Sequence, residues 1–180
     1  MLGRAITHAL VGLEPRRVEV EAEVNEQGLP AFVIVGLPDR ACAEARQRVI
    51  SGINAAELHF PKGRIIVNLA PAALRKEGSG YDLAIALAIL VASRQVPRER
   101  VVAHASVGEL ALDGRLRRVG GVLAVAEGAR RAGLTRVLCS HDAAPEAALA
   151  GVEAVGMRHL AEAVAYLRGE GEPPPPAEPM

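Results

Sequence analysis

An unbroken apolar run from Leu83 to Ala92 constrains the fold of this chain more than any other feature. The run lies within a predicted helix, Asp82–Ser93, and a helix that is apolar on almost every side must be buried on most of them. It is well short of the ~18 residues that a membrane-spanning helix needs. We therefore expect a soluble domain built around this helix, and 180 residues are enough for one sizeable core.

The composition narrows the class of protein. Lys and Arg number 21 and Asp and Glu number 21, so no excess of basic residues over the whole chain points to nucleic acid. Cys42 and Cys139 are too few for a disulfide scaffold and have no metal-like spacing, which favours buried free thiols in a reducing cytoplasm. The five histidines share no ligand spacing, so we expect structural roles for them and no metal site. The expected protein is cytoplasmic and has no membrane contact.

Two segments near the start of the chain have the pattern of β-strands. From Val18 to Val24, apolar residues alternate with Glu19, Glu21 and Glu23, which indicates a strand with one buried face and an acidic row in water. We expect this row to be solvated and to protect an edge of the sheet. The unbroken apolar segment Ala31–Val35 is typical of a central strand.

The rest of the chain alternates between helical and strand patterns. Asp39 is the predicted N-cap of a helix that continues to about Ile53. The dipeptide Asp113-Gly114 predicts a hairpin turn in which both residues adopt positive φ. The further predicted elements are a buried strand at Gly63–Ala70, a helix at Val119–Ala132 ended by Gly133, a strand at Arg136–Cys139, a short helix near Pro145–Ala150, a strand at Val152–Val155 and a helix at Leu160–Arg168. Together they predict a single mixed α/β domain.

A polar loop before the buried helix is the first candidate binding site. It reads Arg75-Lys76-Glu77-Gly78-Ser79-Gly80, and its glycines let backbone amides approach a ligand. The positive end of the following helix would favour an anion there. In the alternative interpretation the glycines only form a turn and Ser79 or Asp82 caps the helix. The loop by itself leaves both open.

Three separated segments resemble one protein family. They are GLPAFVIVGLPD (Gly28–Asp39), RIIVNLAPAALRKEGSGYDLAIAL (Arg64–Leu87) and VGELALDGRLRRVGGVL (Val107–Leu123). In this order they resemble the N-terminal domain of the ComM/YifB proteins, which are magnesium chelatase-like AAA+ ATPases. The resemblance implies a Lon-protease-like α/β (α+β) fold with a mixed sheet. It also implies a hexameric parent that acts as a DNA helicase in branch migration during natural transformation.

The resemblance also implies how the chain is divided. Residues 1–168 would form the Lon-like domain, and residues 169–180 would be a proline-rich linker to a separate AAA+ module. That module would bind ATP and Mg²⁺, and the domain would contact it. The tail Gly169–Met180 contains four consecutive prolines, which predict an extended or disordered segment that cannot join a packed element.

The same resemblance argues against catalysis by this chain. The place of the Lon nucleophile is held by Gly80 and that of the Lon base by Leu123, so the Ser–Lys pair is missing. Ser79 lies one residue away, but no lysine follows it to act as its base. A Walker A loop needs the dipeptide Gly-Lys, which the sequence lacks. We expect no catalytic residue here, and peptide cleavage that disappears in Ser79→Ala would overturn this expectation.

Arginines near the predicted turn form a second candidate surface. Arg115, Arg117 and Arg118 could contact phosphates locally even though the net charge is zero. The candidate contacts for an anion or nucleic acid are Arg75, Lys76, Gly78, Ser79, Gly80, Arg115, Arg117 and Arg118. The domain would then help to assemble the ring or guide DNA. Two alternatives remain, a protein-interaction module, which the acidic row favours, and a small-molecule enzyme, for which we find no base.

Overall fold

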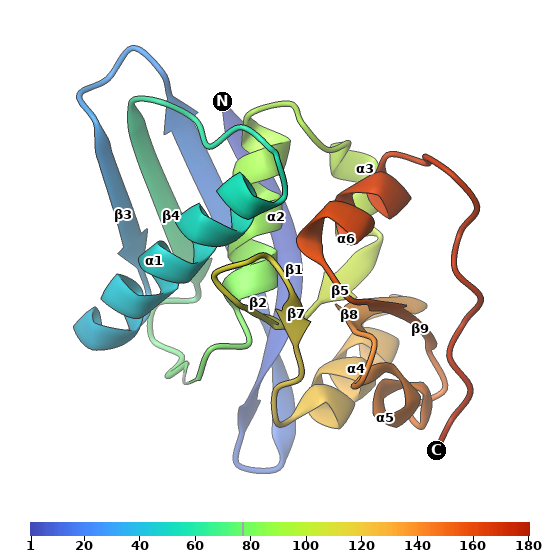
Figure 1. The fold of residues 1–180 in the computed structure, drawn as a ribbon. Coiled ribbons are helices and arrows are strands. Elements are labelled where there is room, and N and C mark those ends of the chain that lie inside the picture. Colours follow the sequence, from blue (N-terminus) through green and yellow to red (C-terminus); the bar gives the residue numbers. More distant parts are fainter. Residues whose placement is uncertain (77) are drawn as a thin grey trace.

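A mixed β-sheet runs through the molecule, with helices on both of its faces (Figure 1). The structure is a computed structural model that describes residues 1–76 and 78–180. Within these residues seven strands follow the order β3-β4-β2-β1-β5-β8-β9, and β6 and β7 form a separate pair. The strands are β1 (Leu2–Val11), β2 (Glu14–Asn25), β3 (Ala31–Val35), β4 (Arg64–Ala70), β5 (His104–Ser106), β6 (Glu109–Leu110), β7 (Leu116–Arg117), β8 (Arg136–Ser140) and β9 (Glu153–Met157). The helices are α1 (Asp39–Ala55), α2 (Asp82–Ala92), α3 (Arg98–Val102), α4 (Val122–Arg131), α5 (Ala144–Ala148) and α6 (Leu160–Leu167). The mixed α/β prediction is confirmed.

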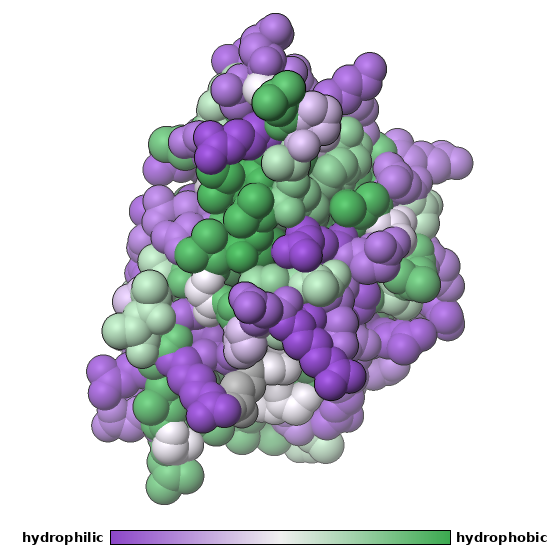
Figure 2. Space-filling view, turned by 90° about the vertical axis from the view of Figure 1, so that its left-hand side faces the viewer, coloured by the Kyte–Doolittle hydropathy of each residue, from purple (hydrophilic) through white to green (hydrophobic). Residues whose placement is uncertain are grey.

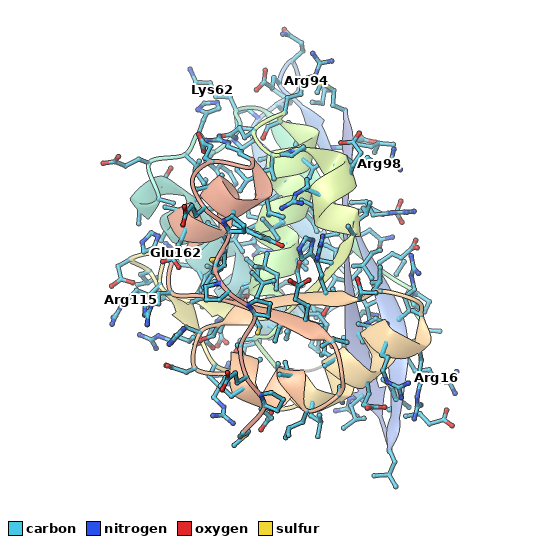
Figure 3. All side chains as sticks on the ribbon, turned by 90° about the vertical axis from the view of Figure 1, so that its right-hand side faces the viewer. Arg16, Lys62, Arg94, Arg98, Arg115 and Glu162 are labelled. Atoms are coloured by element: carbon cyan, nitrogen blue, oxygen red, sulfur yellow. The ribbon has the colours of Figure 1, made fainter. Side chains whose placement is uncertain are left out.

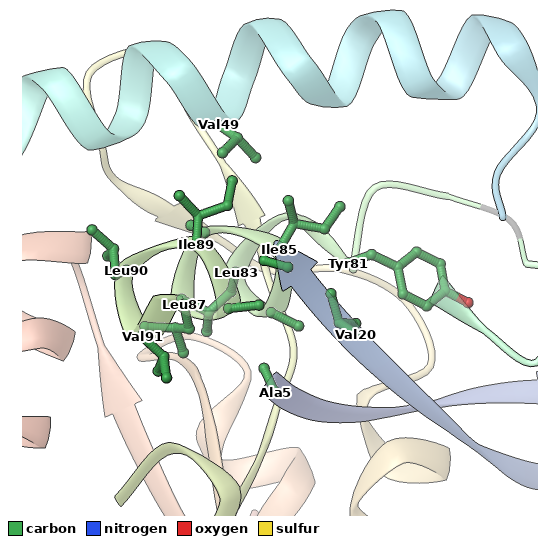
Figure 4. Close-up of a cluster of buried hydrophobic side chains, with 14 of the residues drawn as sticks. Ala5, Val20, Val49, Tyr81, Leu83, Ile85, Leu87, Ile89, Leu90 and Val91 are labelled. Atoms are coloured by element: carbon green, nitrogen blue, oxygen red, sulfur yellow. The ribbon is translucent and has the colours of Figure 1, made fainter. Parts of the chain in front are cut away.

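The helix α2 is the centre of the larger core, as its apolar run predicts. Every residue of α2 is buried, and the helix packs on β1 and β2 with α1 beside it. Figure 4 shows Val49 of α1 above Ile85 and Ile89 of α2 in this cluster. Asp82 does not cap the helix. Its carboxylate instead accepts hydrogen bonds from Arg48 at 2.6 and 3.1 Å and from the Leu110 N–H at 3.0 Å, which ties α2 to α1 and β6.

The opposite face of the sheet carries a second, smaller core. Here α4 and α5 pack on β5, β8 and β9, and their buried side chains are almost all alanine and valine. Cys139 lies in this core and Cys42 in the larger one; both are buried free thiols, as expected. Small side chains let helix and sheet backbones come close, so this half of the molecule is held together without large aliphatic groups.

The central strand β1 is absent from the prediction. Its sequence, LGRAITHALV, does not alternate cleanly between polar and apolar residues, because consecutive residues in its middle are buried on both faces of the sheet. Gly3 points to α2, and a Cβ atom there would collide with the backbone of Ala88. The strand pairs with β2 along its whole length, from Leu2–Glu23 to Val11–Glu14. The sequence therefore marks this strand by a glycine that close backbone packing requires, and not by hydrophobic periodicity.

Two predictions about the sheet edge are wrong. Ala31–Val35 forms β3, which is the edge strand and not a central one, and Val33 and Val35 are more than 40% exposed. Figure 2 faces this side and shows hydrophobic side chains gathered on it. The acidic row of Glu19, Glu21 and Glu23 lies on β2, an interior strand, so it protects no edge. An apolar run therefore does not separate an edge strand from a central one.

Two turn predictions also need correction. Asp39 is the first residue of α1 rather than its N-cap, which is Pro38, and no side chain caps this end. A longer loop joins β6 to β7, because Leu110 pairs with Leu116. Gly114 has φ +88°, whereas Asp113 is not among the residues with positive φ. The turn thus needs one left-handed residue and not two.

The C-terminal tail is extended, in agreement with its prediction, but it contacts the packed elements. Residues 169–180 contain no helix or strand, but they run along the side of the domain (Figure 1). The Ala177 N–H donates to the Ala154 carbonyl at 3.1 Å, and the Met180 N–H donates to the Pro145 carbonyl at 3.3 Å. The tail therefore contacts β9 and the start of α5. Among the described residues, no helix is long and apolar enough to span a membrane.

Candidate functional site

A cavity of about 720 Å³ opens between β1, the loop before α2 and the start of α4. Its wall combines apolar side chains with a few polar ones, the usual composition of a ligand site. The side chains on which the argument below depends are His8, Arg75, Ser79, Val107, Glu109 and Arg118. These residues belong to segments far apart in the sequence. They surround the part of β1 that does not pair with β5.

The cavity brings together five of the eight sequence candidates. Arg75, Gly78, Ser79, Gly80 and Arg118 all line it. The other three, Lys76, Arg115 and Arg117, are not part of its lining. Glu77, the remaining residue of the loop, lies outside the described residues. The glycine-rich loop and one arginine of the turn region therefore form one site, which the sequence treats as two.

Lys76 has a structural position. Its side chain is buried, and its Nζ donates to the carbonyl oxygens of Pro71 at 2.7 Å and Leu74 at 2.6 Å. Burial disfavours the charged amine and lowers the pKa of Lys76. The ammonium group thus holds the loop in shape from the inside.

The three arginines near the β6–β7 turn all contact carboxylates. Arg115 Nε lies 2.8 Å from Asp113, Arg117 lies 4.0 Å from Glu109, and Arg118 lies 2.9 Å from Glu146. Figure 3 shows Arg115 projecting from the surface. Pairs as exposed as these are screened by water and salt, but each carboxylate still reduces the positive potential that phosphate would meet.

The start of α4 faces the same cavity. Gly120 and Gly121 line it, and Gly121, the N-cap, has φ +83° and no side-chain cap. The first N–H groups of a helix have no partner within the helix, and they carry partial positive charge. The N-terminus of α4 therefore adds hydrogen-bond donors to the site.

His8 is the residue of this site that sequence analysis misses. It is only 5% exposed, and its Nδ1 is buried without a hydrogen-bond partner among the described residues. Burial, with a smaller effect of Arg17, lowers the pKa of His8 to about 4, so the ring is neutral at pH 7. Gly128 leaves room for the ring, because a Cβ atom there would lie 2.5 Å from Cδ2 of His8. A lone histidine in an unrecognised strand gives no signal of this kind.

The two places that correspond to the Lon nucleophile and base are held by Gly80 and Leu123, which have neither a hydroxyl nor an amine. Within residues 1–76 and 78–180, no hydrogen bond joins the Ser79 hydroxyl to a base. Leu123, at the place of the Lon base, is partly exposed on α4. The residues also do not fit ATP and Mg²⁺, since the chain has no Gly-Lys dipeptide and its described part no group of three or more metal-ligating side chains. The described wall of the cavity presents arginine side chains, backbone amides and one neutral imidazole.

Comparison with known proteins places the chain in a family. Residues 18–143 match the family model of subunit ChlI of Mg-chelatase. An uncharacterised protein of Mycobacterium tuberculosis is 42% identical over 169 residues, which are 93% of this chain and 33% of that protein. YifB of Escherichia coli is 38% identical over 165 residues, 91% of this chain and 32% of YifB. The competence protein ComM of Haemophilus influenzae is 34% identical over 168 residues, 93% of this chain and 33% of ComM.

The chain thus spans about a third of the length of these relatives. The family model covers well over half of the chain, including the loop before α2 and the start of α4. The matching stretch contains most of the cavity wall described above. The chain therefore belongs to the magnesium chelatase ChlI family, with ComM and YifB among its relatives.

Proposed function

We propose that this chain is a non-catalytic domain of a magnesium chelatase-like AAA+ protein, and that it supports assembly of that protein's ring or its engagement of DNA. The observation that carries this proposal is the cavity itself. It gathers Arg75, Arg118 and the start of α4, and among the residues that the structure describes no hydrogen bond pairs the Ser79 hydroxyl with a base. A site of this composition binds a ligand and does not catalyse a reaction on it.

The activity of the whole protein is part of the same proposal. A separate module would bind ATP and Mg²⁺, the protein would be a hexamer, and it would act in the cytoplasm. It would drive branch migration as a helicase during DNA processing and natural transformation. The name of one relative, competence protein ComM, supports this direction.

Ring assembly is the stronger of the two roles for this domain. Arg115, Arg117 and Arg118 face carboxylates, which leaves less free positive charge for a DNA backbone. Engagement of DNA remains the second candidate, and Arg75 and Arg118 at the cavity favour it. A protein-interaction module of a related chaperone is the alternative, which the exposed glutamates of β2 favour.

The test compares the full-length protein with a variant that lacks residues 1–168. Sedimentation reports ring formation, and a branched DNA substrate with ATP reports branch migration. Loss of rings in the variant supports the assembly role, and intact rings with lost branch migration support DNA engagement. Rings and branch migration that both persist would contradict the proposal.

A matched pair of variants separates the two roles further. Arg118→Ala removes a cavity residue, and Arg117→Ala removes its neighbour outside the cavity. If the domain engages DNA at this site, Arg118→Ala weakens low-salt DNA binding and Arg117→Ala leaves it close to wild type. Equal DNA binding by both variants and the wild type would assign the site to another role.

A further inference from the structure

The outer edge of β1 is open where it borders the cavity. The strand pairs with β2 along its entire length, but its ladder with β5 contains a single pair, Ile6–Ala105. Beyond Ile6 the chain of β5 turns away, since the Val107 N–H donates to Leu138 and the Gly108 N–H to Gly80. In Figure 1 the β1–β2 hairpin projects past the end of β5. The part of β1 from Thr7 to Val11 therefore lacks a neighbouring strand on one side within the described residues.

The ladder with β2 fixes which peptide groups face this open side. Met1 and Val24 exchange two hydrogen bonds, of 3.1 and 2.9 Å. Antiparallel pairing alternates, so Thr7, Ala9 and Val11 also direct their peptide groups to β2. His8 and Leu10 then direct theirs to the opposite side, where both residues line the cavity. The open edge thus offers two N–H and two C=O groups at the spacing of a strand.

The His8 side chain adds an unpaired polar atom at the same place. The residue is 95% buried, and its Nδ1 has no partner among the described residues. Buried polar groups are nearly always hydrogen-bonded in folded proteins. A ligand that supplies donors and acceptors along β1 would satisfy the strand edge beside this imidazole.

The far wall of the cavity indicates the side chains of such a ligand. Val107, Val119 and Val125 form an apolar surface. Among the described lining residues the charged side chains are Arg75, Arg118 and Glu109, and the donors at the start of α4 favour negative charge as well. The wall therefore suits apolar groups and a carboxylate.

We propose that this cavity binds an extended peptide segment with alternating apolar and acidic side chains, which adds as a strand to the open edge of β1 at His8 and Leu10. The geometry is that of β-strand addition, in which backbone hydrogen bonds hold the peptide and pockets read its side chains. About five residues of peptide match the open edge, roughly 16 Å at 3.3 Å per residue. This binding activity goes beyond the role in ring assembly or DNA engagement proposed above.

The probe is a fluorescein-labelled octapeptide, (Val-Asp)4, titrated with the 180-residue chain and followed by fluorescence anisotropy. Two control peptides test the two parts of the proposal. (Val-Lys)4 keeps the strand propensity and reverses the charge, and it should bind at least tenfold more weakly. A (Val-Asp)4 peptide that is N-methylated at alternate residues cannot form the backbone ladder on that edge, and it should also bind at least tenfold more weakly.

Variants of the chain locate the peptide. Leu10→Pro removes the outward N–H and keeps the hydrogen bonds to β2, because Leu10 forms a non-hydrogen-bonded pair with Pro15. Leu10→Ala shortens the side chain and keeps the N–H. We expect at least a tenfold loss of affinity for Leu10→Pro and less than a threefold loss for Leu10→Ala. Arg118→Gln should weaken binding several-fold, whereas Arg117→Gln, outside the cavity, should not. Circular dichroism confirms that each variant is folded.

The amide signals of His8 and Leu10 in NMR spectra give an independent measurement. Both amides should gain protection from hydrogen exchange when (Val-Asp)4 is added, even if a variant proves too unstable to use. Binding that is unchanged in Leu10→Pro, or equal for the acidic and basic peptides, would overturn the proposal. So would displacement of the peptide by a short DNA duplex, or protection of the two amides by self-association without peptide.

Discussion

Two buried histidines lie on neighbouring strands, and their surroundings differ. His104 on β5 hydrogen-bonds through Nδ1 to the Arg100 carbonyl at 2.6 Å and through Nε2 to the Tyr166 hydroxyl at 2.7 Å. His8 on β1 has no such partner and borders the cavity. Burial is the main cause that lowers the pKa of each to about 4. Burial and pKa therefore do not distinguish a structural histidine from one in a binding site, whereas the hydrogen bonds do.

The elements around each ring explain the difference. The helices α3 and α6 close over His104, and the Tyr166 ring meets it edge-on at 5.3 Å. Because the Arg100 carbonyl can only accept, the proton of the neutral ring is on Nδ1, and Nε2 accepts from Tyr166. On the other side of the sheet, Gly128 of α4 leaves room for the His8 ring, because a Cβ atom there would lie 2.5 Å from it. Both ring nitrogens of His104 have hydrogen-bond partners, whereas His8 borders a cavity with room for a ligand.

Acidification should produce the largest effect, and it should affect both regions. The folded-state pKa of each histidine is about 4, below the usual histidine value of 6.5, so the unfolded chain binds the proton first as the pH falls. Stability that is present near pH 7 is lost between about pH 6.5 and pH 4. The loss at pH 4.5 is on the order of 2 to 3 kcal/mol for each histidine. Urea unfolding at pH 7 and pH 4.5 measures it, and the double variant His8→Gln/His104→Gln should show a clearly smaller pH dependence; an unchanged one would contradict the assignment.

Replacing each ring by leucine should separate the two regions. His104→Leu leaves the Arg100 carbonyl and the Tyr166 hydroxyl unpaired in the interior and should cost about 2 kcal/mol of unfolding free energy at pH 7. His8→Leu removes an imidazole whose Nδ1 has no hydrogen-bond partner among the described residues, so its effect should stay within about 1 kcal/mol. Chemical denaturation measures both. If the two variants lost equal stability, the contrast between the histidines would be wrong.

Gly128→Ala should disturb the region of His8 alone. The added Cβ would lie 2.5 Å from the imidazole, so the ring must move, at a cost of about 1 to 2 kcal/mol. Combined with His8→Ala, which frees the space, the same substitution should cost much less. A double-mutant cycle on unfolding free energies measures this coupling. Purely additive effects would show that the contact does not constrain the ring.

The smallest effects are expected at the exposed arginines of the turn. Arg115→Ala and Arg117→Ala should each change the unfolding free energy by no more than about 0.5 kcal/mol, because exposed ion pairs contribute little. Thermal unfolding at low and high salt measures this. A larger loss at either position would mean that these pairs support the β6–β7 loop.

Sequence analysis predicts well the elements whose packing depends on the size of their own side chains and on the spacing of their apolar residues. The run Leu83–Ala92 gives α2, and Gly133, with φ +84°, ends α4 as predicted. It fails where the place of a strand depends on which strand or helix lies beside it. Ala31–Val35 has the composition of a central strand, but only the pairing with β4 determines that it lies at the edge. The same limit explains β1, whose Gly3 makes sense only once α2 is placed against it.

The candidate site was predictable only in part for a similar reason. The glycines and Arg75 stand out as a loop motif, and they line the cavity, whereas their contact with an anion stays a prediction. Lys76 belongs to the same motif, but its ammonium group binds carbonyls within the loop. His8 and the open edge of β1 are created by the departure of β5 from its neighbour, about a hundred residues along the chain. A contact of that range has no local sequence signal.

The position of β1 in the sheet has a consequence for synthesis of the chain. Of the strands described here, the first to be synthesised is a middle strand of the sheet, and β5, its partner on one side, begins only at His104. The β1–β2 hairpin can form early, but it must wait with unpaired edges while β4 and then β5 are made. Contacts of such long sequence separation slow folding and expose strands to wrong partners. A nascent chain of this domain would therefore be most prone to aggregation before its second half emerges.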